Sequence, residues 1–274
     1  MEPWIETYRG TVFRWEVDHN DHFTVAYYLA RIADAGRASL HAFGTAPAPT
    51  VDCFLSYRRE LRVGDVMHIN SGVIGTDGET LVLGHKLFDS VSGELCTTVE
   101  QRVAAKLSAD GRAAAEARRV SWDGPAREVR PRPPHLDRLR DAARDTVKLE
   151  EVDVTGQLSL SAAVHRFSAS NAHVLAAFGL TPAYMREHRR GFSTFEFQLT
   201  MGGEVRRGDP LVVRSGLVHL GSSSMRILHV MTDPRTGAEV ASLQQSGVHF
   251  DQDRRRPAPL PEDLRARALA VYGL

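Results

Sequence analysis

The chain contains two copies of one sequence pattern, and this internal repeat restricts its fold more than any other feature. Residues 16–18 and 151–153 both read Glu-Val-Asp, at an offset of 135 positions. At the same offset, residues 42–44 and 177–179 both read Ala-Phe-Gly. Each copy has an acidic start, an apolar segment and a glycine stop, which predicts the same local structure twice.

A second set of matches follows at an offset of 144 positions. Gly-Asp recurs at 64–65 and 208–209, Ser-Gly recurs at 71–72 and 215–216, and His85 matches His229. The change in offset means that the second copy carries nine extra residues, which we place around 184–190. These residues are basic and polar, so we expect them on the surface or at the mouth of a pocket.

The repeated segments predict one helix and several strands in each copy. Residues 25–43 are apolar and lack proline, which favours a long helix. After this helix, four β-rich segments alternate with turn residues in each copy, and residues 10–17 and 147–152 could each add a strand. The prediction is an α+β fold with two tandem units. Its domains are residues 1–107, a Pro/Arg/Ala-rich linker at 108–146 with a short helix at 136–143, and 147–274 with a proline-rich tail.

Composition excludes several classes of protein. Lys and Arg together number 34, Asp and Glu also number 34, and the formal net charge of +0 argues against a general nucleic-acid binder. We find no apolar run long enough to span a membrane, and the polar N-terminus does not resemble a signal peptide, so we expect a cytoplasmic protein. Cys53 and Cys96 have no metal-binding spacing, and we expect two buried thiols.

A polar run before the first helix holds the residues best suited to chemistry. Asp18, Asn20, Asp21 and His22 lie within five positions of one another. Asp18 or Asn20 could cap the helix, and the start of a helix presents unpaired N–H groups that favour anions. A carboxylate, an amide and an imidazole at such a place are suited to hydrolysis.

This run resembles a known family motif. Asp18-x-Asn20-x-His22, with Tyr28 ten positions after the aspartate, is similar to the motif of acyl-ACP and acyl-CoA thioesterases with the hotdog fold. The tail at 254–267 resembles that of the 4-hydroxybenzoyl-CoA-thioesterase-like group. Two copies in one chain resemble the tandem-hotdog form, in which each unit has an antiparallel sheet around a long helix.

The resemblance implies a thioesterase that hydrolyses an acyl-CoA or acyl-ACP to free acid and thiol. It implies catalytic roles for Asp18, Asn20 and His22 and substrate contacts from Phe23, Thr24 and Tyr28, with no cofactor and no metal. Asp18 could be the general base for water or a direct nucleophile, and this choice stays open. Asp52 and Glu196, matched by the second offset, are more simply interpreted as charges on the sheet surface.

Two departures from the family pattern limit what the resemblance implies. The family's Val-Asn-Asn is here Phe23-Thr24-Val25, so an amide pair is missing. In the plant acyl-ACP enzymes the catalytic motif lies in the second unit, whereas here the second copy has Thr155 and Gln157 in place of the amide and the imidazole. We therefore expect a single site at Asp18, with Asp153 mainly structural.

Two other functions remain as alternatives. A non-catalytic protein that binds acyl thioesters would account for the altered residues after His22. A hotdog enoyl-thioester hydratase is disfavoured, because its Asp-x-Asn-Pro-x-His motif has a proline and one more residue before the histidine. Further association of the tandem unit into a homo-oligomer is left open.

Overall fold

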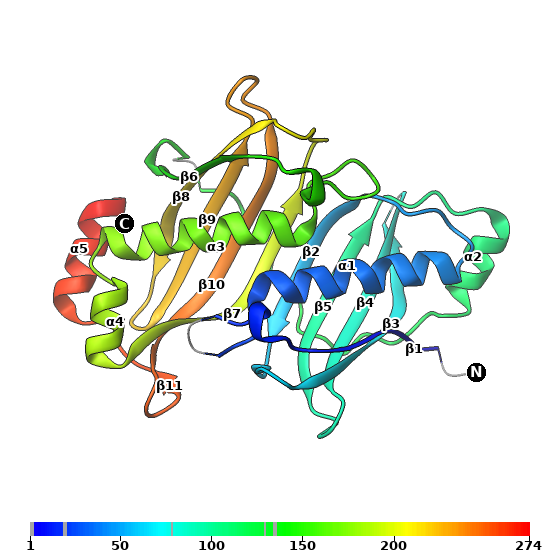
Figure 1. The fold of residues 1–274 in the computed structure, drawn as a ribbon, viewed down its shortest axis with the longest axis horizontal. Coiled ribbons are helices and arrows are strands. Elements are labelled where there is room, and N and C mark those ends of the chain that lie inside the picture. Colours follow the sequence, from blue (N-terminus) through cyan, green and yellow to red (C-terminus); the bar gives the residue numbers. More distant parts are fainter. Residues whose placement is uncertain (1–2, 19–20, 78, 129, 134–135) are drawn as a thin grey trace. The chain divides into compact units, whose positions relative to one another are not determined.

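The computed structural model describes residues 3–18, 21–77, 79–128, 130–133 and 136–274 (Figure 1). The chain forms two compact units. Unit 1 contains Met1–Arg127 together with Glu150–Val164, and unit 2 contains Glu128–Leu149 together with His165–Leu274. Residues 150–164, which precede and begin the second long helix, therefore pack with the first unit.

Unit 1 is built from one long helix and a five-stranded antiparallel sheet. The strands follow the order β1-β3-β4-β5-β2. Its elements are β1 (Ile5–Thr11), 3-10 helix η1 (Arg14–Glu16), α1 (Val25–Ala42), β2 (Thr50–Tyr57), β3 (Val66–Asp77), β4 (Thr80–Asp89), β5 (Leu95–Val103) and α2 (Ala109–Glu116).

Unit 2 repeats this arrangement with the strand order β6-β8-β9-β10-β7. Its first elements are 3-10 helix η2 (Leu136–Arg138), β6 (Arg140–Thr146), 3-10 helix η3 (Leu149–Glu151, assigned partly to unit 1) and α3 (Leu160–Ala177, of which the first residues belong to unit 1). They are followed by α4 (Pro182–His188), β7 (Arg190–Met201), β8 (Pro210–Leu220), β9 (Ser224–Thr232), β10 (Glu239–Asp251), β11 (Arg256–Pro257, paired with β10) and α5 (Glu262–Tyr272). The predicted α+β architecture with two tandem copies is confirmed.

Helix α1 begins and ends where its sequence changes character. One face is fully buried and includes Leu29, Ile32 and Leu40, which are at most 1% exposed. Apolar residues at helical spacing place this face against the sheet. Gly44 follows the last turn with φ of 65°, a left-handed conformation that glycine adopts without steric cost and that ends the helix as predicted.

Each sheet contains a buried histidine that is hydrogen-bonded to neighbouring polar side chains. In unit 1, Ser71 Oγ contacts His85 Nδ1 at 2.6 Å, and His85 Nε2 contacts Gln101 Oε1 at 3.0 Å. In unit 2, Ser215 Oγ contacts His229 Nδ1 at 2.7 Å. Burial lowers the pKa of His85 to about 4 and that of His229 to about 3, so both rings are neutral at neutral pH. The matched histidines are therefore core residues.

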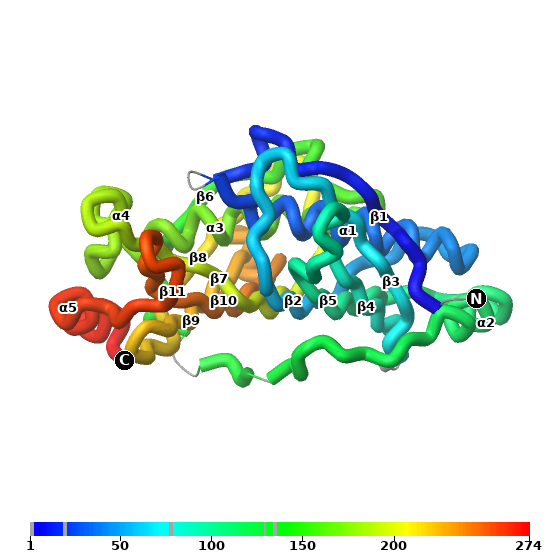
Figure 2. Tube along the Cα trace, turned by 90° about the horizontal axis from the view of Figure 1, so that it is seen from below, coloured from blue at the N-terminus to red at the C-terminus, as the bar shows by residue number. Residues whose placement is uncertain are grey.

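The linker covers the sheet face opposite the long helix in each unit (Figure 2). In unit 1, Arg127 Nη1 lies 2.6 Å from Asp52 Oδ1. In unit 2, Arg130 pairs with Glu196 and also donates to Ser246 Oγ at 2.9 Å. Asp52 and Glu196 are thus sheet-face charges, as the simpler interpretation holds, and arginines of the linker neutralise them.

Two local predictions are wrong. The segments 10–17 and 147–152 do not supply the further strands, because most of their residues lie in or beside the 3-10 helices η1 and η3. The first strands of the two units are β1 and β6, which begin further upstream. In the first copy, the Glu16 carboxylate accepts a bond from Phe13 N at 3.0 Å, which folds the chain back on itself. Residues 136–143 do not form the expected helix, because β6 gains hydrogen-bond partners along β8.

One expectation about side chains can be compared directly with the structure. Cys53 and Cys96 are free and buried, which confirms the interpretation as thiols. Within the described ranges, no helix combines the length and the hydropathy needed to cross a bilayer. No group of three or more His, Cys, Asp or Glu side chains is arranged to hold a metal ion in that part of the chain either.

Candidate functional site

The motif loop of the first copy is a tight hairpin closed by its own aspartate. Asp18 N donates to His22 O at 2.9 Å, and Asp18 Oδ1 accepts from His22 N at 3.1 Å. Val17 and Phe23 form an antiparallel bridge on either side of these bonds. The carboxylate therefore holds the loop shut, and the Asp18 residue is exposed to solvent. Asn20, the predicted amide of the site, lies outside the described residues.

The predicted catalytic imidazole is fixed by a second acid. His22 Nε2 lies 3.2 Å from Glu60 Oε2, and both side chains are about a third exposed or less. The backbone of His22 also bridges to Arg62, which attaches the loop to the segment that precedes β3. Asp18 and His22 are thus brought together through one loop, and Glu60 is a neighbour that the sequence analysis missed.

Asp21 occupies the strained position of the loop. Its φ is 58°, in the left-handed region where glycine is favoured, and its side chain pairs with Arg14 across the exposed edge. The corresponding residue in the second copy is Gly156, with φ of 83°. The positive φ belongs to the loop shape itself, whichever residue stands there.

The three residues predicted to contact substrate, Phe23, Thr24 and Tyr28, pack or form hydrogen bonds within unit 1 next to the loop. Phe23 and Tyr28 are 4% and 3% exposed, with ring centroids 4.6 Å apart. The Tyr28 hydroxyl accepts a bond from Leu61 N at 3.3 Å, and Tyr57 packs edge-on against its ring at 5.3 Å. Burial raises the pKa of Tyr28 well above its ordinary value, so the hydroxyl is neutral. Thr24 Oγ1 donates to Glu16 O at 2.8 Å.

The start of α1 has no side-chain cap. Thr24 occupies the N-cap position, and its hydroxyl is directed to Glu16 rather than to the helix, so Asp18 does not have the capping role considered above. The N–H groups of the first helical turn are the donors that a capping side chain would otherwise satisfy. An uncapped helix start directly after the motif loop can stabilise negative charge.

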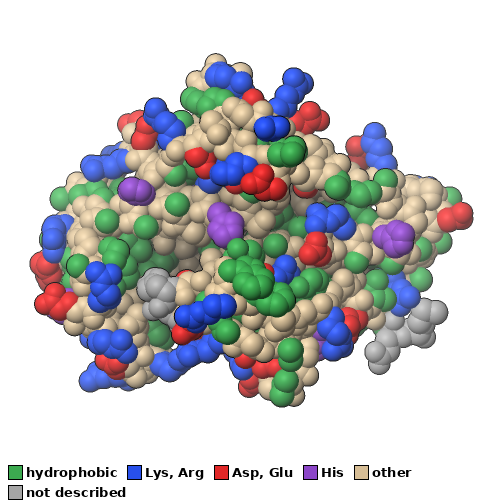
Figure 3. All heavy atoms as spheres, in the orientation of Figure 1, with side chains coloured by type: hydrophobic (Ala, Val, Ile, Leu, Met, Phe, Trp, Pro, Cys, Tyr) green, Lys and Arg blue, Asp and Glu red, His purple; other side chains and the backbone are tan. Residues whose placement is uncertain are grey.

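An exposed apolar patch adjoins the motif loop. Phe13 and Trp15 are 44% and 71% exposed and stack with ring centroids 4.6 Å apart. Val63 and Val66, which are 40% and 38% exposed, lie on the neighbouring segment that bonds to Val12. The face drawn in Figure 3 shows hydrophobic side chains gathered over η1 and the start of α1.

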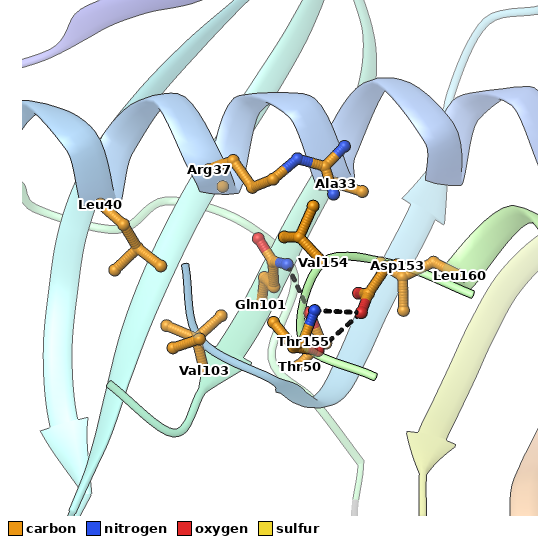
Figure 4. A pocket seen from close by; sticks show the side chains of 12 residues that line it. Ala33, Arg37, Leu40, Thr50, Gln101, Val103, Asp153, Val154, Thr155 and Leu160 are labelled. Atoms are coloured by element: carbon orange, nitrogen blue, oxygen red, sulfur yellow. Dashed lines mark hydrogen bonds between the residues drawn. The ribbon is translucent and has the colours of Figure 1, made fainter. Parts of the chain in front are cut away.

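The second copy of the loop lies in unit 1 and has the same shape. Asp153 N donates to Gln157 O at 2.8 Å, and Asp153 Oδ1 accepts from Gln157 N at 3.2 Å. Thr155 adds two further bonds to Oδ1, from its N–H at 2.8 Å and from its hydroxyl at 2.6 Å (Figure 4). This carboxylate is engaged on one oxygen by three donor groups of its own loop.

A small pocket lies between the second loop and α1 in unit 1. It is lined by Arg37, Thr50, Gln101, Asp153 and Thr155 among others, and its volume of about 20 Å³ is enough for a water molecule but not for an acyl chain. Gln101 Nε2 donates to Thr50 Oγ1 at 2.9 Å (Figure 4). The sequence analysis missed Gln101, although its match to Gln245 at the 144 offset was a signal.

Comparison with known proteins identifies the family of the two repeated units. The family model described as "Thioesterase-like superfamily" matches residues 12–136 and again 147–268. These two matches correspond to the two copies recognised in the sequence. A comparison with curated protein sequences finds no match.

Three solved structures resemble most of the chain. They are the 12:0-ACP thioesterase from Umbellularia californica (12% identity, TM-score 0.64, covering 90% of this chain and 94% of that chain) and a putative oleoyl thioesterase from Lactobacillus plantarum (10%, 0.68, 94% and 97%). The third is an acyl-ACP thioesterase from Bacteroides thetaiotaomicron (11%, 0.66, 90% and 98%). At these identities the structures show a shared fold, and the family match covers nearly the whole chain. The chain belongs to the thioesterase-like superfamily.

Proposed function

We propose that this protein hydrolyses an acyl-CoA or acyl-ACP thioester to a free acid and a thiol, with Asp18 and His22 as catalytic residues. The observation that carries the proposal is the motif loop, which holds a carboxylate and an imidazole directly before an uncapped helix start. The family match and the three full-length structural neighbours support the same reaction class. We also propose that each copy is a hotdog unit and that the protein works in the cytoplasm.

The reaction needs an attacking oxygen and a donor for the oxyanion. In one route, Asp18 accepts a proton from water while the water oxygen bonds to the thioester carbonyl carbon. In the other, the Asp18 carboxylate attacks this carbon itself, and water hydrolyses the resulting anhydride. In both routes the carbon–sulfur bond breaks, and the thiolate leaves and takes up a proton.

The first turn of α1 supplies the oxyanion donors in this proposal. Preorganised N–H groups of this kind are worth about 3 kcal/mol each when they face developing charge. Glu60 orients His22, whose imidazole can donate to the thioester carbonyl or hold the attacking water. Asn20 completes the proposed set. Phe23 and Tyr28 contribute through their packing, because their rings contact each other and the Tyr28 hydroxyl bonds to Leu61, which fixes the position of the loop.

The test is release of free thiol from a panel of acyl-CoA and acyl-ACP substrates of different chain length and head group. Turnover by wild-type protein that is lost in Asp18→Asn supports the proposal. Absence of thiol release from every substrate, with the thioester still bound, would favour the non-catalytic binding protein, which the residues Phe23-Thr24-Val25 also allow. Loss of enoyl-CoA absorbance without thiol release would identify a hydratase instead.

A further inference from the structure

Unit 2 contains a cleft whose walls include helix α4, and no helix lies at the corresponding place between α1 and β2 in the described part of unit 1. Its volume is about 600 Å³, within the range of small-molecule sites. The walls come from α4, from the end of β10 and from the proline-rich segment before α5, and they include Tyr184, His188, Arg190, His249, Asp251, Arg254, Ala258, Pro259, Pro261 and Asp263. Helix α4 belongs to the nine residues that only the second copy carries, so the cleft is an addition to the repeated fold.

Packing fixes the walls of this cleft. Tyr184 and Met185 of α4 pack on the same apolar cluster that contains Leu260 and Leu264. The Thr181 hydroxyl caps α4 by accepting from Tyr184 N at 3.2 Å. Figure 1 shows α4, β11 and α5 next to one another at one end of unit 2. The cleft is therefore preformed by well-packed elements.

The charges around the cleft leave an excess of arginine. Each acid has its own partner: Asp251 lies 2.9 Å from Arg190, Asp253 lies 3.1 Å from Arg189, and Asp263 lies 2.6 Å from Arg267. Asp251 also accepts from two backbone N–H groups, those of residues 253 and 254, at 3.1 and 3.0 Å. These acids are neutralised before any ligand binds.

Arg254 forms no close ion pair in the described part of the chain, although its charge helps to lower the pKa of Asp251. Its side chain is exposed, lines the cleft and makes no salt bridge within the described ranges. Arg186 and Arg256 are exposed on the elements beside it. Figure 3 shows basic side chains at this end of unit 2, with acidic side chains among them. A guanidinium that makes no close ion pair can still bind phosphate oxygens in a bidentate manner.

The remaining walls offer flat apolar contacts. The rings of Tyr184 and His188 lie 4.5 Å apart at an angle of 46°. Ala258, Pro259 and Pro261 form the apolar part of the lining. Burial raises the pKa of Tyr184, so its ring is partly removed from water and its hydroxyl stays neutral. A planar ring bound here would replace water on both apolar surfaces.

A buried acceptor completes the lining. His249 is 1% exposed, and its Nδ1 faces the carbonyl oxygens of Ala258 and Pro259 at 3.0 and 3.1 Å. Since carbonyl oxygens only accept, Nδ1 carries the proton and Nε2 is an acceptor. This Nε2 is buried and has no hydrogen-bond partner. A ligand amino group, reached directly or through a bridging water, would satisfy it.

We propose that this cleft binds a nucleotide, with its phosphate on Arg254, its planar base between Tyr184 and the proline wall, and a base amino group toward His249. The inference rests on the proposed function for its biological meaning, because the nucleotide is then the adenosine end of coenzyme A. It makes CoA, rather than an acyl carrier protein, the carrier that this chain recognises. A concave cleft with ring contacts suits a small molecule better than a protein surface.

The test is calorimetric binding of adenosine 3′,5′-bisphosphate, with adenosine and inorganic phosphate as separate probes. The bisphosphate should bind more tightly than either, and Arg254→Ala and Tyr184→Ala should each weaken it about tenfold or more, as expected for loss of a charged hydrogen bond or a ring contact. Arg207→Ala removes an exposed arginine that does not line the cleft and should leave binding unchanged. Circular dichroism confirms that the variants are folded.

Several outcomes would overturn the assignment. One is failure of the bisphosphate to bind, and a second is binding of inorganic phosphate as tightly as the bisphosphate. A third is weakening of binding by Arg207→Ala as large as that by Arg254→Ala. A fourth is Arg254-dependent binding of an acyl carrier protein in place of the nucleotide. The binding assay contains no thioester, so its result does not depend on catalysis. Bisphosphate binding by a protein that releases no thiol from any thioester in the separate assay would reject the proposed function and keep the cleft as a nucleotide site.

Discussion

The two motif loops have the same backbone and different chemistry beside it. The aspartate N–H bonds to the carbonyl four positions on at 2.9 Å in the first loop and 2.8 Å in the second. The corresponding carboxylate bonds are 3.1 and 3.2 Å. Each loop is closed by a bridge, between Val17 and Phe23 or between Val152 and Leu158. An aspartate at this position is therefore required by the loop, whether or not it performs catalysis.

The difference between the loops lies in the residues that accompany the aspartate. In the second loop, the Thr155 hydroxyl and N–H bind the carboxylate oxygen of Asp153, and Gln157 stands where the first loop has an imidazole. In the first loop, His22 reaches Glu60. The comparison teaches that the aspartate alone does not identify the site. The neighbours of the aspartate make the first loop the better candidate.

The largest expected effect separates the two aspartates. Asp18→Asn should reduce kcat/KM for the thioester by about a thousandfold, because the amide is neither a base nor a nucleophile. Asp153→Asn should change kcat/KM less than twofold and reduce the free energy of unfolding by about 1 kcal/mol, since it weakens hydrogen bonds to a charged oxygen. Thiol-release kinetics and urea unfolding measure the two effects.

These two substitutions control for each other, because they make the same chemical change in loops of the same shape. Equal losses of turnover in two folded variants would show that both loops contribute to catalysis. A fully active Asp18→Asn variant would exclude Asp18 from the mechanism.

The matched core histidines should make the fold sensitive to acid. Burial lowers the pKa of His85 to about 4 and that of His229 to about 3, compared with about 6.5 in an unfolded chain. Below pH 6.5 the unfolded chain binds protons that the folded chain does not, so stability is complete above this pH and declines as the pH falls toward the folded pKa. Between pH 6.5 and 5 the loss should be about 2 kcal/mol for each histidine.

Urea unfolding at several pH values measures this slope. His85→Gln should reduce the slope by less than half, because His229 and His249, whose pKa values burial also lowers, still titrate on unfolding. An unchanged slope in His85→Gln would mean that His85 is not a neutral core residue. A stability curve that is flat between pH 6.5 and 5 would contradict the interpretation for both units.

Exchanging the residues that follow the aspartates tests the chemical difference itself. His22→Gln gives the first loop the residue of the second and should reduce kcat/KM about tenfold, with loss of the part of the pH profile that depends on an imidazole. Gln157→His is the reciprocal change and should leave turnover unchanged, because the pocket beside the second loop is the size of a water molecule. Full activity and an unaltered pH profile in His22→Gln would remove His22 from the mechanism.

The smallest expected effect concerns the shared left-handed position. Gly156→Ala should destabilise the protein by about 1 kcal/mol through its φ of 83°, because no other atom lies within 4 Å of the added methyl group. Asp21→Gly should not destabilise the first loop, since glycine relieves the same strain and the pair with Arg14 is largely exposed. Thermal unfolding measures both effects, and an unchanged midpoint temperature in Gly156→Ala would contradict the predicted destabilisation.

Much of the fold was predictable because local patterns and tertiary contacts agree. The helix at 25–43 was placed to within a residue of α1, and the four strands after each helix appear in the expected order. The strand β6 was missed, since Arg140–Thr146 is mostly exposed and polar and has no strand pattern of its own. It forms because its backbone groups pair with the N–H and C=O groups along the edge of β8.

The sequence by itself determined the repeat, the α+β class and the position of one motif loop, because periodic burial and turn residues are local properties. Only the tertiary structure decided which side chains accompany each aspartate, since Glu60 pairs with His22 from the segment between β2 and β3, and Gln101 of β5 lines the pocket beside the second loop. It also decided that Phe23 and Tyr28 are buried next to each other, and that linker arginines neutralise Asp52 and Glu196. These outcomes depend on which residues the packed sheets bring within a few ångströms, and spacing along one chain does not encode that.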